Sequence, residues 1–249
     1  MKNEKFLLKS KLVNDIRIHQ PRSSREEIYA FPKGYQMIGT RYALKLREIK
    51  FLIQGNHLFN VYFNPELSVG EILFADENKW NPVGKGFQDV EIGVNPSKFN
   101  PLSDKEKNEF IVQHITKMFT EVNKRYKLDL KALKQVESII LESGEDMEFV
   151  YKIKENQKYK VIISYQVKLP NEAKAFITYI DKQNNNSSGK VTVPTQLFED
   201  IFYLAGSIQV KDSMVTLKSR DSHISQVYTK RYELPMKISA ETYQVILEV

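Results

Sequence analysis

The side chains best suited to chemistry in this sequence are its histidines and its acid-x-Lys triplets. The histidines are His19, His57, His114 and His223. No two of them have the spacing of a helical zinc pair. His114 is the one candidate for a metal or acid–base role, because it lies beside an apolar helical stripe with Glu121 one heptad further on. The simpler interpretation is a half-buried histidine on a helix.

Three acid-x-Lys triplets are of the type found in metal-dependent nucleases. They are Glu48-Ile49-Lys50, Glu77-Asn78-Lys79 and Glu172-Ala173-Lys174. None follows an isolated aspartate at a strand end, and a chain with 27% charged residues produces such triplets by chance. Metal-dependent cleavage is therefore the third hypothesis for function.

Sequence signatures of cofactor sites are also missing. The chain has no cysteine, which excludes disulfides, thiolate catalysis and iron–sulfur clusters. It has no dinucleotide, Walker or nucleophile-elbow motif, and Gly84-Lys85-Gly86 lacks the flanking residues of a phosphate loop. We therefore expect no catalytic residue, no cofactor and no metal.

The net charge of +6 leaves nucleic-acid binding as an alternative. Basic residues stand in an N-terminal arm and beside aromatic residues near the C-terminus, the combination that single-stranded nucleic-acid binders use. The candidates are Arg17, Arg22, Arg25, Lys218, Arg220, Lys230 and Arg231. The competing interpretation is that they are solvated side chains on exposed strand faces.

Residues 76–86 form a polar segment rich in turn-forming residues, and they contain the only tryptophan, Trp80. Aromatic residues are enriched at the energetically dominant positions of protein interfaces. We take Trp80, Lys85 and Phe87 as candidate partner-binding residues. Trp80 could equally be a loop anchor that packs on a sheet.

The best-defined element in the sequence is a helical pair over residues 103–144. It must position the β-like segments on either side of it. Ser103 and Glu106 have the spacing of a capping box, and Asp129 can cap a second helix that ends at Gly144. The apolar face of the first helix consists of Ile111, Ile115, Met118, Val122 and Tyr126. We expect this pair to join two β-rich regions.

Strand-like sequence precedes the pair. We expect an edge strand over residues 4–13, a short capped helix over 23–31, and a long strand over 37–53. Residues 54–56 would turn this strand back into a partner over 58–63. Shorter strands are expected at 71–75 and 87–94.

The last hundred residues predict three antiparallel strands, at 149–153, 159–167 and 173–180. A helix over 197–205 follows. The remaining predicted strands are 208–210, 214–217, 225–232 and 243–249. The fold class is thus α+β, with antiparallel β-rich regions around the helical pair and one further helix in the C-terminal half. Two lobes, 1–145 and 146–249, or one continuous domain are both compatible with this order.

The segment Phe87-Gln88-Asp89-Val90-Glu91-Ile92-Gly93-Val94, followed by Leu102-Ser103-Asp104-Lys105-Glu106-Lys107, resembles bacterial immunity proteins of polymorphic toxin systems. The resemblance covers residues 58–125 and is one of pattern. It implies a protein-binding inhibitor without catalytic residues. Because the chain is basic, an acidic or non-nuclease toxin is the expected partner.

The leading hypothesis is a cytoplasmic, non-enzymatic protein that binds and inhibits a partner protein, such as a toxin domain. Lys9 and Lys11 interrupt any N-terminal apolar run, so no signal peptide is expected, and no stretch is long enough to span a membrane. Nucleic-acid binding in replication, transfer or defence is the alternative, and metal-dependent cleavage comes third. The oligomeric state stays open.

Overall fold

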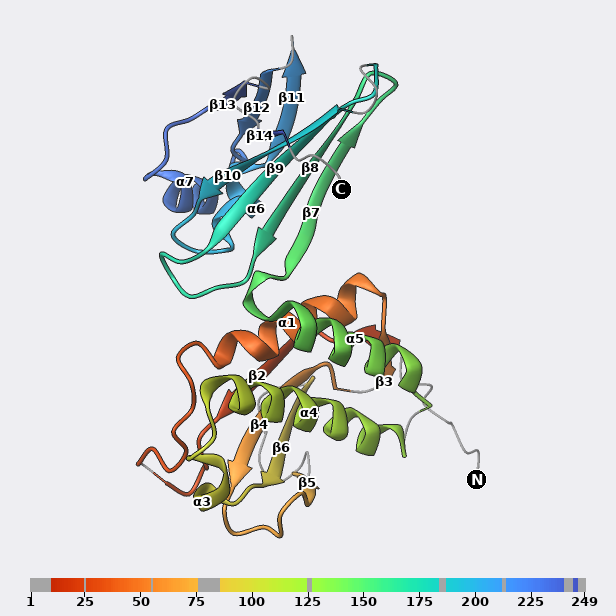
Figure 1. The fold of residues 1–249 in the computed structure, drawn as a ribbon, viewed down its shortest axis with the longest axis vertical. Helices are drawn as coiled ribbons and strands as arrows, with labels where there is room; N and C mark the ends of the chain where they lie inside the picture. Colours follow the sequence, from red (N-terminus) through yellow and green to blue (C-terminus); the bar gives the residue numbers. More distant parts are fainter. Residues whose placement is uncertain are drawn as a thin grey trace, which may run out of the picture. The chain divides into compact units, whose positions relative to one another are not determined.

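The chain divides into two compact units, here called unit 1 (Met1–Gly144) and unit 2 (Glu145–Val249). The computed structural model describes residues 10–24, 26–54, 56–75, 86–124, 127–183, 187–211, 214–239 and 244–245. Both units combine helices with sheets, so the predicted α+β class is confirmed (Figure 1). None of the described helices is long and apolar enough to cross a membrane.

Unit 1 is built on a four-stranded sheet in the order β2-β4-β6-β5. Its strands are β2 (Asp15–His19), β4 (Leu58–Asn64), β5 (Ile72–Phe74) and β6 (Phe87–Gly93). β2, β4 and β6 run parallel, whereas β5 is antiparallel to β6. Outside this sheet, β1 (Ser10–Leu12) pairs antiparallel with β3 (Leu52–Gln54).

Helix α1 (Gln36–Glu48) connects the parallel strands β2 and β4. Ile38, Tyr42 and Leu46 recur every four residues and are buried. Gly39 lies against β2 so closely that a Cβ atom would stand 2.1 Å from the carbonyl oxygen of Ile16. The helix can therefore approach the strand only because a side chain is missing at this position.

The predicted helical pair is present as α4 (Asp104–Asn123) and α5 (Leu130–Ser143), both within unit 1. The Ser103 hydroxyl accepts the Glu106 amide and the Glu106 carboxylate accepts the Ser103 amide, so the capping box is confirmed. Asp129 caps α5 through two backbone amides. The short helix α3 (Pro96–Phe99) precedes α4.

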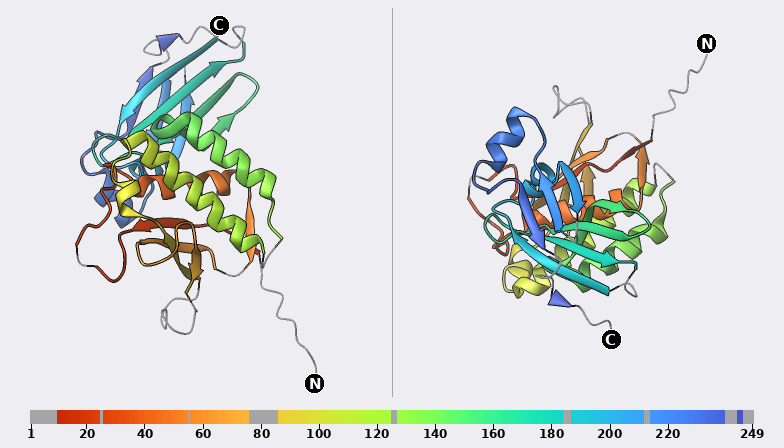
Figure 2. Two further views of the ribbon diagram at one scale, coloured as in Figure 1. Left: turned by 60° about the horizontal axis from the view of Figure 1, so that its bottom comes forward. Right: turned by 90° about the horizontal axis from the view of Figure 1, so that it is seen from above.

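The core of unit 1 lies between the sheet and its three long helices, which share one face of the sheet (Figure 2, left). Phe119 of α4 packs its ring against those of Tyr42, Phe51 and Phe59. The Tyr42 hydroxyl forms a 2.8 Å hydrogen bond with Thr116. These contacts join α1, α4 and β4 into one apolar layer.

Unit 2 contains a five-stranded antiparallel sheet in the order β14-β10-β9-β8-β7. The strands are β7 (Glu148–Glu155), β8 (Tyr159–Gln166), β9 (Lys174–Asp181), β10 (Ser187–Pro194) and β14 (Gln244–Val245). The turn η1 (Gly144–Asp146) leads into β7. Three of these strands, β7, β8 and β9, confirm the predicted antiparallel set; β10 is an element that sequence reasoning missed.

A second sheet in unit 2 has the order β11-β12-β13. Its strands are β11 (Ser207–Lys211), β12 (Met214–Lys218) and β13 (Met236–Ser239). The predicted helix is α6 (Asp200–Leu204). It is followed after β12 by α7 (His223–Thr229), a second helix in this half of the chain.

The structure corrects three local predictions. Residues 37–48 belong to helix α1, and the end of the predicted strand, residues 52–53, lies in β3, so 37–53 is not the first strand of a hairpin and β4 instead pairs in parallel with β2. The described residues of 23–31 form no helix, and Ser24 Oγ instead accepts the amide of Glu26 two residues on. Residues 225–232 belong mainly to α7, which Ser222 caps by accepting the amide of Ser225.

Candidate functional site

The second face of the unit 1 sheet carries polar side chains in two rows. Each row takes one residue from β2, β4 and β6, since parallel pairing sets these residues side by side. The rows are Arg17, Asn60, Asp89 and His19, Tyr62, Glu91. We call these six residues the polar face. Parallel strands are usually apolar on both faces, so a polar face on them is unusual and marks this surface as a candidate site.

Asp89 is the centre of a hydrogen-bond network on this face. Its side chain is only 5% exposed and it forms an ion pair with Arg22. Asn60 donates a second hydrogen bond to it at 2.7 Å. The Arg22 guanidinium also lies 4.4 Å from the centroid of the Tyr62 ring and 3.3 Å from the Tyr62 hydroxyl. Arg22 thereby ties the loop after β2 to β4 and β6.

His19 stacks on the ring of Tyr62. Its ring centroid lies 4.9 Å from that of Tyr62, with 23° between the ring planes. Burial lowers the pKa of His19, and a hydrogen bond with Asn60 opposes this only in part. The buried Nε2 of His19 has no hydrogen-bond partner among the described residues. The pKa of His19 therefore lies below its ordinary value, and its buried Nε2 is not engaged by the described residues.

A pocket of about 280 Å³ lies where the parallel strands end. It is lined by Arg22, Ser23, Tyr62, Phe63, Asn64, Glu66 and Glu91. Asn64 donates a 2.6 Å hydrogen bond to the Glu91 carboxylate. The carboxyl ends of parallel strands are a common place for ligand sites. The pocket thus extends the polar face toward the loops.

The polar face combines hydrogen-bond donors with hydrogen-bond acceptors. It offers carboxylate, amide, phenol, imidazole and guanidinium groups. Asn60 bonds to Asp89 within the face, while Tyr62 and Glu91 bond to the neighbouring Arg22 and Asn64. Within the described ranges, no group of three or more His, Asp or Glu side chains could hold a metal ion. Preorganised donors and acceptors of this kind suit an interface with a few fixed polar contacts.

Three residues predicted from sequence meet on or beside this face. Arg17 is 57% exposed and bonds to Asp15 at 2.7 Å. Arg22 is held by Asp89, and Phe87 begins β6 in the same alternating set as Asp89 and Glu91. Trp80, Lys85 and Arg25 lie outside the described residues.

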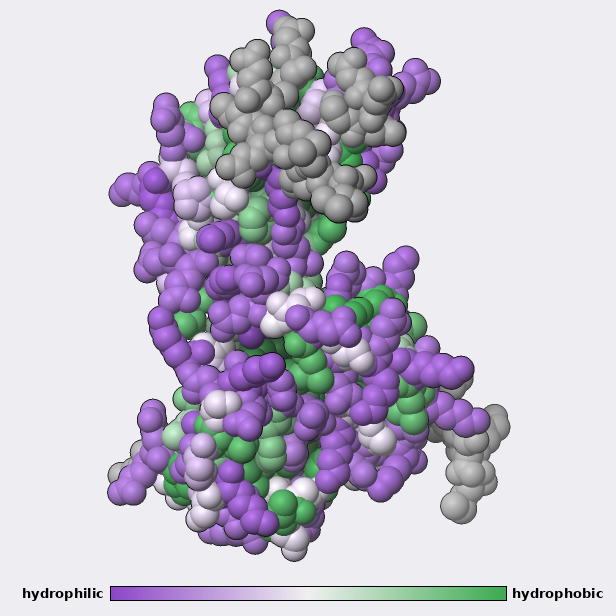
Figure 3. All heavy atoms as spheres, in the orientation of Figure 1, coloured by the Kyte–Doolittle hydropathy of each residue, from purple (hydrophilic) through white to green (hydrophobic). Residues whose placement is uncertain are grey.

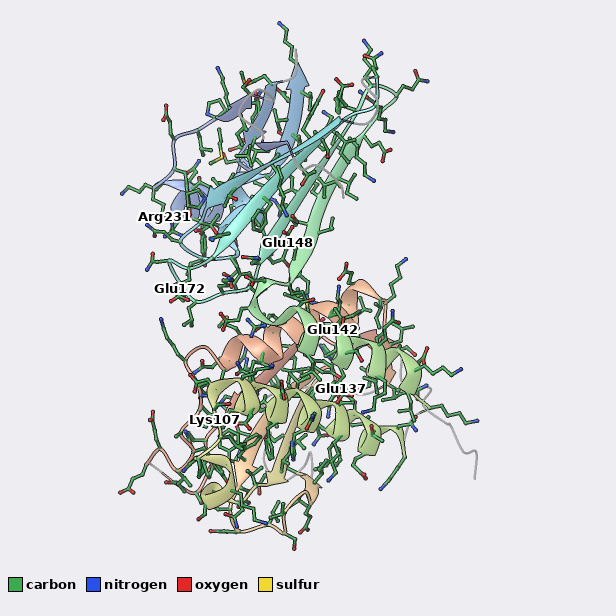
Figure 4. The ribbon with its side chains drawn as sticks, in the orientation of Figure 1. Lys107, Glu137, Glu142, Glu148, Glu172 and Arg231 are labelled. Carbon is green, nitrogen blue, oxygen red and sulfur yellow. The ribbon has the colours of Figure 1, made fainter. Side chains whose placement is uncertain are left out.

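The candidate basic residues of unit 2 are partly engaged inside that unit. Arg231, which is labelled in Figure 4, forms a 2.5 Å ion pair with Asp200. The side chain of Asp200 is fully buried. Arg220 donates to the Tyr151 hydroxyl at 2.7 Å. Lys218 ends β12 and Lys230 follows α7, both exposed. Hydrophilic residues cover most of the visible surface, with small hydrophobic patches between them (Figure 3).

The structure also shows where His114 and the acid-x-Lys triplets lie. His114 stacks on Phe110 at 3.9 Å, its Nδ1 lies 2.8 Å from the Phe110 carbonyl oxygen, and burial lowers its pKa. Glu48 ends α1 and pairs with Lys45. Glu172 lies in a turn before β9, and Glu77 lies outside the described residues. Among the residues of the two described triplets, only Lys174 lies on a strand, as the first residue of β9.

Sequence reasoning missed His19, Asn60, Tyr62, Asp89 and Glu91 as one group. The signal was present in β4, where Asn60, Tyr62 and Asn64 alternate with buried Phe59, Val61 and Phe63. Alternation shows that one face is polar, but only the parallel register shows which residues stand beside it.

Comparison of the chain with family models, curated protein sequences and solved structures gave no match.

Proposed function

We propose that this protein is a non-enzymatic binding protein that recognises a partner protein through the polar face and the adjoining pocket. The observation that carries the proposal is the alternation of buried and polar residues on three parallel strands. Such strands gain stability from apolar cover on both faces, so polar residues on one face serve another purpose. Partner binding is the purpose that fits a face whose polar groups are fixed in place.

The finer proposal is that the partner is a toxin, that binding inhibits it, and that this takes place in the cytoplasm. It is supported by the pattern resemblance to immunity proteins over residues 58–125. That range includes β4, β6 and α4, two of which contribute to the polar face.

The test is capture of a partner by the immobilised full-length protein, followed by titration calorimetry with the purified partner. Arg17→Glu and Tyr62→Ala change the polar face, and we expect each to weaken binding at least about tenfold. Lys105→Glu is the matched charge reversal on α4, where the lysine side chain is 86% exposed. It should bind like the parent. If Arg17→Glu and Lys105→Glu weakened binding equally, the interface would lie outside the polar face.

Nucleic-acid binding remains the competing hypothesis and needs a separate measurement. A protein that contacts several phosphates loses orders of magnitude in affinity between about 50 and 200 mM salt. We expect no such binding, because Arg22 and Arg231 are held by buried carboxylates. Tight, salt-sensitive binding to DNA or RNA would favour the alternative.

A further inference from the structure

Strand β7 forms one edge of the five-stranded sheet in unit 2 (Figure 1). It is eight residues long, and β8 pairs with it on one side. In the described part of the chain, no strand pairs with its other side. A strand edge presents backbone N–H and C=O groups in a row, and another extended strand is the partner that matches such a row.

Proteins commonly protect such an edge with lysine side chains. β7 has two suitable lysines, but both ammonium groups bond elsewhere. Lys152 donates to the carbonyl oxygen of Gly206 at 2.6 Å, and Lys154 donates to that of Ile208 at 2.7 Å. These lysines therefore cover carbonyls at the start of β11 and do not protect the edge of β7.

On the face of the sheet opposite to Lys152 and Lys154, the side chains of β7 form a symmetric pattern. Val150 and Ile153 are 52% and 50% exposed. They share a face because a bulge between Val150 and Lys152 adds one residue to β7 relative to β8. Glu148 and Glu155 stand outside them on the same face, opposite Gln166 and Lys160.

Both glutamates are already neutralised within their own unit. Glu148, near the start of β7 (Figure 4), binds Lys190 and accepts a 2.7 Å hydrogen bond from Ser164. Glu155 binds Lys182 at 2.5 Å. β7 thus displays an apolar centre between two carboxylates that carry their own counter-ions.

We infer that β7 pairs antiparallel with β7 of a second copy of this chain. In this register, Val150 of one copy lies opposite Ile153 of the other, and Glu148 lies opposite Glu155. Each contact occurs twice, as two-fold symmetry requires. The facing glutamates do not repel strongly, because Lys190 and Lys182 stand beside them. A slip of one residue would set apolar side chains against residues of the other face, so the register is fixed.

The contact is small. Pairing along one eight-residue edge buries less than the roughly 1,200 Å² of a standard interface, so the dimer is reversible and dissociates on dilution. The inference concerns unit 2 and does not rest on the polar face of unit 1.

Sedimentation equilibrium of the full chain over about a hundredfold range of concentration tests the dimer. We expect the average mass to rise above the 29.1 kDa of the monomer as concentration increases. Ile153→Lys should weaken the association at least about tenfold. Ile224→Lys is the matched control, since Ile224 on α7 is 58% exposed. A mass that stays monomeric throughout, or equal effects of the two variants, would overturn the inference.

Cross-linking tests the register even if a lysine variant fails to fold. The chain has no cysteine, so Val150→Cys and Ile153→Cys each introduce a single thiol. Opposed residues of antiparallel strands lie about 4.5–5.5 Å apart, within disulfide range. With diamide as the oxidant, a mixture of the two variants should form disulfide dimers faster than either alone. Equal rates in all three samples would refute the proposed pairing.

Discussion

Replacement of Asp200 by Asn tests how unit 2 is held together. The Asp200 side chain is fully buried and receives hydrogen bonds from four groups. The donors are the Arg231 guanidinium (2.5 Å), the Tyr232 hydroxyl (2.5 Å) and the backbone amides of Gln196 (3.1 Å) and Leu197 (2.9 Å). These bonds fix the chain before α6 to the segment after α7.

The substitution keeps the shape of the side chain but removes its charge. One of the two carboxylate oxygens becomes an NH₂ group that faces donors, whichever way the amide turns. Removal of one partner from a buried ion pair costs about 3–5 kcal/mol. The Arg231 side chain is 32% exposed and regains some hydration, so we expect the lower end, about 3 kcal/mol. For a unit of this size that is a fall of about 12–24 °C in Tm.

Differential scanning calorimetry of the full chain measures the change, and hydrogen exchange assigns the affected transition to unit 2. Asp221→Asn is the matched control, since Asp221 is exposed in the same unit. It should unfold within about 2 °C of the parent. If Asp200→Asn and Asp221→Asn unfold at the same temperature, the buried ion pair does not have the stabilising role argued here.

Three further predictions concern unit 1. Burial raises the pKa of Tyr29 to about 12, so only the unfolded phenol ionises between about pH 10 and 12 and stability falls in that range. Tyr29→Phe removes the hydrogen bond to the Val94 carbonyl oxygen and should lower the free energy of unfolding by about 1 kcal/mol at pH 8. Urea titrations at pH 8 and 11 should show a smaller difference between variant and parent at pH 11, because only the parent is destabilised by ionisation of this phenol. Gly39→Ala should lower the free energy of unfolding by about 1–3 kcal/mol, because its Cβ would clash with the Ile16 carbonyl oxygen. This cost outweighs the preference of alanine for helix. A higher free energy of unfolding in urea would contradict the close contact. Ser103→Ala removes the cap of α4 and should cost about 1 kcal/mol in the same assay, whereas no loss would mean that the capping box adds nothing measurable.

Local signals in the sequence were sufficient for α4 and α5. Ser103, Glu106 and Asp129 act through neighbours three residues away or fewer, so their roles depend little on the rest of the fold. The antiparallel strands β7, β8 and β9 were also predictable, since short turns connect consecutive strands.

Helix α1 shows why the rest was harder. Tyr42, Leu44 and Leu46 alternate with basic residues and imitate a strand, whereas the buried positions Ile38, Tyr42 and Leu46 follow a helical period. Arg41 is also buried, against the usual preference of arginine for the surface. A strand over 37–53 would make β4 its hairpin partner, which leaves no place for the parallel pairing of β4 with β2.

The polar face could not be predicted for the same reason. Asp89 and Asn60 are 29 residues apart, and Asp89 and Arg22 are 67 apart. Only the parallel register sets them side by side, and no periodicity within one segment carries that information. The sequence does show that β4 has one polar face.

The parallel order of β2, β4 and β6 also has a consequence for the speed of folding. Asp15 pairs with Leu58 and Leu58 pairs with Phe87, so each ladder must close a long loop before it gains any contact. β7, β8 and β9 instead meet through short connections. Proteins dominated by distant pairings fold more slowly than those with local ones. Unit 1, although it leaves the ribosome first, should therefore complete its sheet more slowly than unit 2 forms the β7-β8-β9 meander.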